Sequence, residues 1–219
     1  MEHYNVLIAT PGSMMEADYV KSLVNTLEEC SNRGITYKFL NSYASLVYNA
    51  RELTMTGYDS RQLDPNDKGP LKDRVSYDKI FWIDSDISWE PWQFFRLYES
   101  EHDVITGAYL LADCITTSVH GWGTATHIPK SEIMQMSGET TVQSAGFGFI
   151  TMKSGVFEKI NRPWFKHYTQ TLKKEDGSEL EMVLGEDISW CIDAYKLGIK
   201  IYFDPEVLVK HTKKIPITW

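Results

Sequence analysis

Asp84, Ser85 and Asp86 directly follow the apolar run 79–83, which has the length and composition of a buried strand. In open α/β sheets, ligands bind beyond the carboxyl ends of the strands. Two carboxylates at that edge suit a hard cation such as Mg²⁺ or Mn²⁺, which bridges to phosphate oxygens. The alternative is a turn that uses aspartate for its local hydrogen bonds. The triplet therefore indicates either a metal site or a turn.

A second acidic pair, Glu186 and Asp187, follows Gly185 at the start of a run with helical spacing. The helix dipole stabilises acidic residues in a first turn by about 0.3 to 1 kcal/mol, which explains the pair without any catalysis. The alternative is that one carboxylate serves as a general base or orients an acceptor.

Basic residues near these acids allow two interpretations as well. Arg51 lies in a predicted helix and is either a surface ion-pair partner or a fork that grips a diphosphate. His211 follows the last predicted strand and stands beside Lys213 and Lys214. It is either a solvated histidine or a neutral imidazole that completes a metal site, with the lysines near a phosphate.

Apolar periodicity predicts the elements that hold these side chains. Strands and helices alternate along most of the chain, which predicts an α/β domain with a mostly parallel central sheet flanked by helices. The predicted strands are 4–9, 35–40, 79–83, 103–109, 142–152, 199–203 and 207–209, and the predicted helices are 18–30, 41–57, 91–99, 154–160 and 186–197.

Three segments lack a clean period. The segment 59–74 is predicted as a surface loop, and 112–139 as irregular structure above the sheet. A second irregular region, 161–185, has a charged, hairpin-like tip at 173–177 that suits a lid. Within the predicted strand 142–152, two glycines indicate close approach by another group.

Tryptophans fall in both kinds of context. Trp122 and Trp164 lie in the irregular segments, where flat rings suit the faces of sugars. Trp82 and Trp190 lie in a strand and a helix, where core packing is expected.

Composition limits the classes of partner. The chain has 219 residues, 42% of them hydrophobic, which is enough for one large domain with a full core. A formal net charge of −8 without a long basic run makes nucleic acid a poor partner. Cys30, Cys114 and Cys191 lack the spacing of a zinc or disulfide framework and are predicted to be reduced core residues. No apolar run reaches about 18 residues and the start lacks signal-peptide features, so we expect no transmembrane segment and a cytoplasmic location.

Together these pieces resemble the GT-A fold glycosyltransferases, and most closely the small bacterial and viral enzymes related to glycosyltransferase family 2. The likeness runs from residue 4 to about residue 211 and rests on the order and spacing of its motifs. It implies one Rossmann-like GT-A domain over 1–219, with a nucleotide-binding half to about 110 and an acceptor and catalytic half from about 111. The motifs are the start 4–11, Arg51, the acidic triplet after Ile83, Ala145 to Phe149, Gly185 to Asp187 heading a helix that ends in Leu197 and Gly198, and His211.

The resemblance also implies an activity, the transfer of a sugar from a nucleoside-diphosphate sugar to a hydroxyl of a glycan, glycolipid or protein. Mn²⁺ or Mg²⁺ would lie on the diphosphate, with Asp86 as its main ligand, His211 as a further ligand, and Asp84 as a ligand that also contacts the ribose or sugar. The donor would also meet Thr10, Pro11, Arg51, Ser85, Gly146 and Lys213, the acceptor would meet Trp122 and Trp164, and Asp187, beside Glu186, would be the catalytic base of an inverting enzyme.

Two features bear on the substrates. Asn41 and Ser42 stand where an acidic residue would read a uracil ring, so the base of the donor stays open. The chain ends at Trp219 without C-terminal membrane helices, which favours a soluble acceptor or one presented at a membrane surface.

Two other function classes fit such a fold. A sugar nucleotidyltransferase or a phosphohydrolase would use the same strand-end acids, but the segment 9–13 has one glycine and no basic residue to cradle a triphosphate. A non-catalytic sugar-binding or nucleotide-binding scaffold would need none of Asp86, Asp187 and His211.

Overall fold

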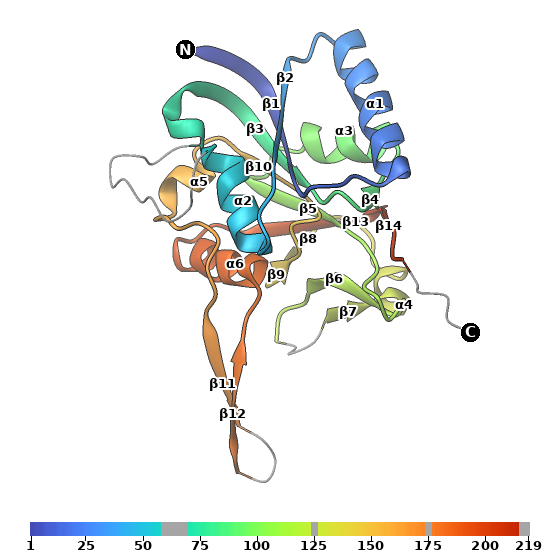
Figure 1. The fold of residues 1–219 in the computed structure, drawn as a ribbon. Coiled ribbons are helices and arrows are strands. Elements are labelled where there is room, and N and C mark those ends of the chain that lie inside the picture. The colour runs from blue at the N-terminus through green and yellow to red at the C-terminus, as the bar shows by residue number, and fades with distance from the viewer. Residues whose placement is uncertain (58–69, 124–126, 174–176, 215–219) are drawn as a thin grey trace, which may run out of the picture.

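The computed structural model describes residues 1–57, 70–123, 127–173 and 177–214 (Figure 1). Its centre is a seven-stranded sheet. In sheet order the strands are β2 (Tyr37–Ser42), β1 (Glu2–Pro11), β3 (Val75–Ile83), β10 (Phe149–Lys153), β5 (Val104–Ala108), β13 (Ile201–Leu208) and β8 (Thr140–Val142).

Most strands of this sheet run the same way. β1 pairs in parallel with both β2 and β3, and β5 pairs in parallel with β13. β10 lies antiparallel between β3 and β5, and β8 is antiparallel beside β13. Five strands therefore share one direction and two oppose it, which confirms the predicted α/β class and mostly parallel sheet.

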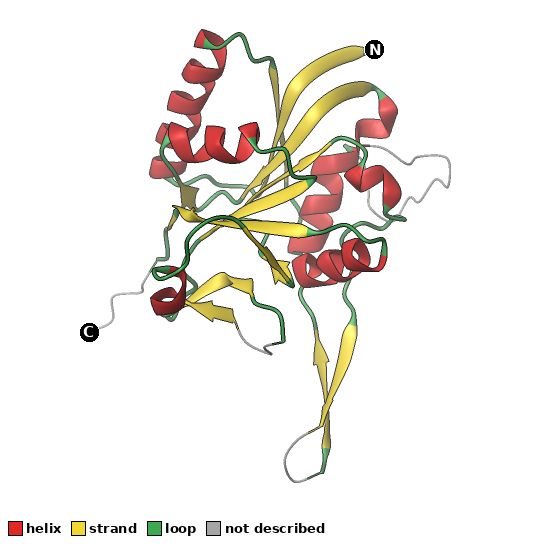
Figure 2. Cartoon of the chain, turned by 180° about the vertical axis from the view of Figure 1, so that it is seen from behind, coloured by secondary structure: helices red, strands yellow, loops and turns green. Residues whose placement is uncertain are grey.

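Helices cover both faces of the sheet. Successive side chains of a strand point to opposite faces, so Val6 and Ile8 of β1 enter one buried core while Leu7 and Ala9 enter the other. A sheet buried on both faces accounts for the nearly continuous apolar run in β1. The helices of the first core are α1 (Ala17–Asn32) and α3 (Pro91–Glu99), and those of the second are α2 (Val47–Thr56), α5 (Val156–Lys159) and α6 (Glu186–Lys196) (Figures 1 and 2).

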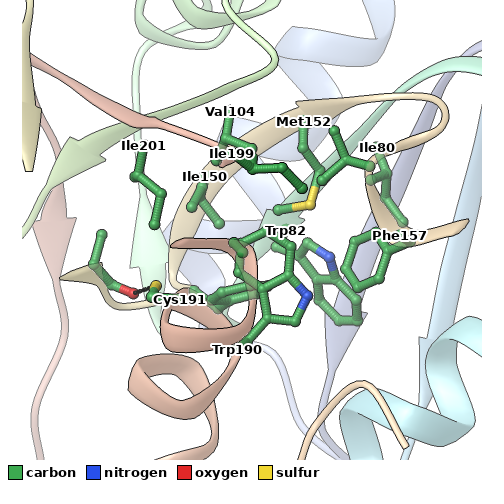
Figure 3. Close-up of a cluster of buried hydrophobic side chains, with 14 of the residues drawn as sticks. Ile80, Trp82, Val104, Ile150, Met152, Phe157, Trp190, Cys191, Ile199 and Ile201 are labelled. Atoms are coloured by element: carbon green, nitrogen blue, oxygen red, sulfur yellow. Dashed lines mark hydrogen bonds between the residues drawn. The ribbon is translucent and has the colours of Figure 1, made fainter. Parts of the chain in front are cut away.

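The core beneath α6 is rich in aromatic rings (Figure 3). Trp82 of β3 and Trp190 of α6 are fully buried, and Phe157 lies 6.3 Å from the first ring and 5.6 Å from the second. The thiol of Cys191 donates to the carbonyl of Ala145 (3.7 Å) in the same core. The prediction that both tryptophans are core residues is confirmed.

The segment predicted as irregular above the sheet contains regular elements, so that prediction is wrong. It holds β6 (Thr116–His120), β7 (His127–Pro129) and α4 (Lys130–Ile133). β6 pairs with β7 and also with β9 (Ser144–Ala145). These short strands are stabilised by a partner far along the chain, a contact that local periodicity does not reveal.

The single strand predicted over 142–152 is also wrong, because the chain there is divided between β8, β9 and β10. Each piece joins a different neighbour: β8 pairs with β13, β9 with β6, and β10 with β3 and β5. Gly146 and Gly148 lie in the break between β9 and β10.

The second irregular region carries a hairpin. β11 (Thr169–Lys173) pairs with β12 (Glu179–Val183), and the hairpin extends away from the body of the protein (Figure 1). The residues 174–176 of the predicted charged tip lie outside the described residues. The lid role stays a prediction.

Two further boundaries differ from expectation. The helix predicted over 41–57 begins at Val47, because Asn41 continues β2 and its side-chain amide donates to the carbonyls of Thr10 (2.8 Å) and Gly12 (3.0 Å). Most of the predicted loop 59–74 lies outside the described residues, and its described part includes a short 3-10 helix, η1 (Pro70–Asp73).

All three cysteines are free, as predicted, and Cys30 and Cys191 are buried. Cys114 is exposed, so its predicted place in the core is wrong; it sits just before β6 at a positive φ of 58°. Within the described part of the chain, no helix is both long and apolar enough to cross a membrane.

Candidate functional site

A small two-stranded pairing brings the end of the chain to the acidic triplet. β4 (Ile87–Ser88) pairs with β14 (Lys210–His211), which sets His211 opposite Ile87. His211 Nε2 then lies 3.2 Å from Asp86 Oδ2, and Lys213 Nζ lies 2.8 Å from the same oxygen. The two segments are far apart in sequence, and the fold joins them at the carboxyl end of β3, as predicted.

The hydrogen bonds of His211 indicate which of its ring nitrogens carry a proton. His211 Nδ1 lies 2.7 Å from the carbonyl oxygen of Leu110, and since a carbonyl only accepts, Nδ1 carries a proton. Burial raises the pKa of Asp86, but the hydrogen bonds from His211 and Lys213 outweigh it and bring the pKa to about 2, so this carboxylate only accepts. Nε2 therefore either donates a second proton to Asp86 or turns a lone pair toward the carboxylate, and only the second arrangement suits a cation between them.

The donor set at Asp86 suits a hard divalent cation in part. Among the described residues, no three His, Cys, Asp or Glu side chains come together as a metal site. Asp84 accepts hydrogen bonds from Arg51 and does not join Asp86 and His211. Of the three predicted metal ligands, only Asp86 and His211 therefore lie side by side. A carboxylate and an imidazole held by a backbone carbonyl are common metal ligands, and Mg²⁺ often takes one or two carboxylates plus substrate phosphates and water. The pair therefore fits a cation that shares its coordination with a phosphate.

Arg51 lies inside the protein between two carboxylates. Its Nη2 donates to both oxygens of Asp84 (2.9 and 3.2 Å), and its Nε donates to Glu186 Oε1 (3.0 Å). The side chain is 3% exposed and lies over the rings of Trp82 and Phe147. Arg51 is an ion-pair partner, as one interpretation has it, but it lies in the interior instead of on the surface, and its Nε and Nη2 bind carboxylates rather than a diphosphate.

Glu186 and Asp187 have different surroundings at the start of α6. Glu186 is buried and bound to Arg51. Burial, together with the charge of Glu186, raises the pKa of Asp187 to about 6, although Arg51 opposes the shift. Asp187 Oδ1 accepts from the backbone N–H of Ile188 (2.8 Å), which orients the carboxyl group. Asp187 thus has the pKa of a general base near neutral pH, whereas Glu186 is held in an ion pair.

Gly146 and Gly148 make room for Tyr109. A Cβ on Gly146 would lie 2.3 Å from the Tyr109 hydroxyl oxygen, and a Cβ on Gly148 would lie 2.7 Å from two carbons of the same ring. The expected close approach is therefore by a side chain of this protein. Gly146, predicted to contact the donor, shapes the site through Tyr109 instead.

Tyr109 is a site residue that sequence reasoning missed. It is 9% exposed, and its ring meets the ring of His211 edge-on at 4.9 Å. Burial raises its pKa, and the charges of Asp84 and Asp187 raise it further, so the phenol stays protonated. Gly146 and Gly148 indicated that another group approaches closely, but they do not identify that group as the ring of Tyr109.

The predicted nucleoside pocket at the end of β1 is closed to solvent. Thr10 is fully buried and its hydroxyl is 2.5 Å from that of Tyr19, and Pro11 is buried as well. Ser85 is partly exposed, and Gly12, with φ of 137°, leaves space for its hydroxyl. Thr10 and Pro11 therefore act through packing in this structure, and only Ser85 of these three predicted donor contacts reaches the surface.

The two tryptophans predicted to contact an acceptor differ. Trp164 is fully buried, and its indole N–H donates to the carbonyls of Phe157 and Ile160 (both 3.1 Å). Its ring has no free face for a sugar, so its acceptor role is withdrawn. Trp122 follows β6, is 50% exposed and lies 5.5 Å from the ring of Tyr195.

Comparison with known proteins gives one kind of likeness, that of the fold. No family model matches the sequence, and the search of curated proteins gives no match. Solved structures with a similar fold include A197 from STIV, a viral protein, with a TM-score of 0.50 and 16% sequence identity. The match covers 100% of this chain and 98% of that chain. At this identity the likeness concerns the arrangement of elements.

Proposed function

We propose that this protein is a metal-dependent glycosyltransferase of GT-A type, which moves a sugar from a nucleoside-diphosphate sugar to a hydroxyl of a glycan, glycolipid or protein. The observation that carries the proposal is the cluster of Asp86, His211 and Lys213 at the carboxyl end of β3. This edge of an open α/β sheet is where ligands bind, and a carboxylate, an imidazole and an ammonium group together suit a metal-bound diphosphate.

On the donor side, Asp86 and His211 would hold Mn²⁺ or Mg²⁺. The bound cation would supply positive charge to the departing diphosphate. Lys213 is 48% exposed and already contacts Asp86, so its ammonium group is close enough to pair with a phosphate oxygen. Negative charge on the leaving diphosphate increases as its bond to the sugar breaks. A positive charge beside the diphosphate therefore stabilises the transition state more than the bound substrate.

On the acceptor side, Asp187 would take the proton of the attacking hydroxyl. The acceptor oxygen forms a bond to the anomeric carbon, and the bond from that carbon to the diphosphate oxygen breaks with its electron pair leaving on the phosphate. A base on the face opposite the leaving group inverts the configuration of the sugar. A carboxyl with a pKa of about 6 is largely ionised at neutral pH and close to the pKa that favours proton transfer.

Arg51 would be a positioning residue of this site. It ties the end of β3, through Asp84, to the start of α6, through Glu186. The donor-side and acceptor-side carboxylates are thereby fixed relative to each other by a buried side chain. Free cysteines agree with a reducing compartment, and a cytoplasmic location is part of the same proposal.

Release of nucleoside diphosphate from a panel of sugar nucleotides, with and without Mn²⁺, tests the proposal. We expect Mn²⁺-dependent release from one class of donor, at least a hundredfold less release in Asp86→Ala and Asp187→Asn, and wild-type release in the exposed control Asp103→Ala. Wild-type release by Asp86→Ala would show that Asp86 is not the metal ligand. Pyrophosphate formation from a nucleoside triphosphate and a sugar phosphate would instead support a nucleotidyltransferase.

A further inference from the structure

Three adjoining hollows lie along α6, from its start to just beyond its end. The largest, about 530 Å³, includes His120 and Trp122 on one side and Met182 of β12 on the other. A second, about 340 Å³, runs between β11 and α6, and a third, about 210 Å³, lies beneath Trp122 and Tyr195. Gln143 lines all three. We name the three together the Gln143 groove.

Two projecting units form the walls of the Gln143 groove. The unit of β6 and β7 and the hairpin of β11 and β12 extend from the same side of the central sheet (Figures 1 and 2). Gln143 lies between them, and its backbone N–H donates to the carbonyl of His120 (3.0 Å), which fixes its position while its side chain stays exposed. The largest hollow alone falls within the range of about 300 to 1,000 Å³ that small-molecule sites occupy.

The lining combines amides, hydroxyls and aromatic rings with aliphatic side chains and two lysines, Lys196 and Lys200. Gln143 and Gln170 each offer donors and an acceptor, and Ser144 adds a hydroxyl. The described lining residues include no Asp or Glu. His120 is kept uncharged at neutral pH because burial and then the charge of His127 lower its pKa to about 4. The amides match the hydroxyls of a neutral sugar, each of which both donates and accepts, and the apolar side chains match its C–H faces.

An aromatic ledge marks one part of the groove. Trp122 and Tyr195 are 50% and 63% exposed, and their ring centroids are 5.5 Å apart at 55°. Trp122 lines both the largest and the smallest hollow, so a chain that passes from one to the other crosses its ring. Exposed aromatic faces pack well against the C–H faces of pyranose rings.

The other part of the groove passes the turn that carries the proposed base. Leu184 and Gly185 line the largest hollow, and Asp187 follows two residues later in the first turn of α6. Asp187 does not itself line the hollow, but Gly185 and Ile188 on either side of it do, so a sugar bound here would lie beside the turn that carries Asp187.

From this geometry we infer that the acceptor is a neutral oligosaccharide of three or more sugars, bound along the Gln143 groove with its terminal hydroxyl toward Asp187. The inference rests on the proposed function for the role of that hydroxyl, but binding of the oligosaccharide is independent of the donor. It excludes a lone monosaccharide as the preferred acceptor.

Calorimetric titration with defined neutral oligosaccharides tests this inference in the absence of nucleotide and metal. The probes are series of one to six units built from glucose, mannose, galactose or N-acetylglucosamine. We expect one series to bind, with at least tenfold higher affinity for the trisaccharide than for the monosaccharide. Trp122→Ala and Gln143→Ala should each weaken binding at least tenfold. Trp92→Ala should leave binding unchanged, because Trp92 is equally exposed (52%) but lies on α3.

The outcomes separate this inference from the proposed function. Equal affinity for probes of one and six sugars, or wild-type affinity in Trp122→Ala and Gln143→Ala, would overturn the inference that several sugars bind along the Gln143 groove. Failure of every series in a protein that binds a nucleoside diphosphate with Mn²⁺ would overturn the oligosaccharide acceptor and leave the transferase proposal in place. If the protein binds one series but no nucleotide, the Gln143 groove is supported as an oligosaccharide site and the proposed transferase activity is overturned. Thermal melts of each variant show whether a loss of binding reflects unfolding.

Discussion

Replacing Gly146 by alanine tests the packing that surrounds the proposed site. The new methyl group would lie 2.3 Å from the hydroxyl oxygen of Tyr109 but 3.3 Å from the nearest ring carbon and from Ser118 Cβ. The clash is therefore almost entirely with one oxygen atom. Inserting a methyl group into a well-packed core costs about 1 to 3 kcal/mol, and we expect a loss of that size in the free energy of unfolding.

The Tyr109→Phe substitution removes that oxygen and supplies the second arm of a double-mutant cycle. Alone it should cost about 1 to 3 kcal/mol, because the backbone N–H of Gly148 loses its bond to the hydroxyl. In the double variant with Gly146→Ala the clash is absent, so its stability should be close to that of Tyr109→Phe alone. The coupling energy should then equal the cost of the clash, about 1 to 3 kcal/mol.

Gly148→Ala provides the matched comparison. Its methyl group would meet two ring carbons of Tyr109 at 2.7 Å as well as the hydroxyl at 2.8 Å, so removing the oxygen leaves most of the clash. Urea unfolding followed by tryptophan fluorescence gives each free energy, provided that the dependence on denaturant is unchanged. Additive costs for Gly146→Ala and Tyr109→Phe, or equal coupling at both glycines, would refute the assigned position of the ring.

Five further outcomes are expected. Arg51→Met should lower the free energy of unfolding by about 3 to 5 kcal/mol because it leaves the buried Glu186 and the partly exposed Asp84 (28%) unpaired, whereas Arg33→Met, whose ion pairs are exposed, should cost much less in the same urea titration. The value of kcat/KM for sugar transfer should rise with pH and level off above about 6 as Asp187 ionises, and a flat profile would exclude this base. Because the pKa of Asp187 is raised, its contribution to stability is complete below its ordinary value of 3.8 and is lost as pH rises through about 6, a loss that Asp187→Asn should abolish in pH-dependent melts. NMR of the product should show inverted anomeric configuration. His211→Ala should raise the Mn²⁺ concentration for half-maximal donor turnover at least tenfold, and an unchanged Mn²⁺ titration would be evidence against His211 as a metal ligand.

Local pattern was enough to predict β1, β2, β3 and β5 of the central sheet, whereas β8 and β10 were predicted as one strand and β13 as two. The run before Asp84 is buried on both faces of a parallel sheet, and such strands are continuous apolar runs that the sequence displays directly. In α6 the helical spacing of Ile188, Cys191, Ile192 and Tyr195 predicted the helix but not its buried face, because Tyr195 is 63% exposed and Trp190, Cys191 and Ala194 enter the core. The pairing of β4 with β14 brings Asp86 and His211 together, and only the resemblance implied that these two residues share a site.

Contacts between distant segments were beyond the reach of such patterns. Whether Arg51 meets phosphates or carboxylates depends on the positions of two other elements, and burial beside Asp84 and Glu186 decided it. Tyr109 was missed because nothing in its own neighbourhood distinguishes it from a strand residue. Trp164 was misassigned because its segment has no periodicity, although its ring belongs to the main core.

The most direct test of the proposed function is thermal unfolding in the presence of UDP, GDP, CDP or dTDP, each with and without Mn²⁺. A ligand at 100 times its dissociation constant stabilises the folded state by about 2.7 kcal/mol. We expect one nucleotide to raise the midpoint only when Mn²⁺ is present, and Asp86→Ala to lose that shift. No shift with any of the four, with or without metal, would contradict a nucleotide-sugar site at Asp86 and favour a scaffold that keeps the fold without the activity.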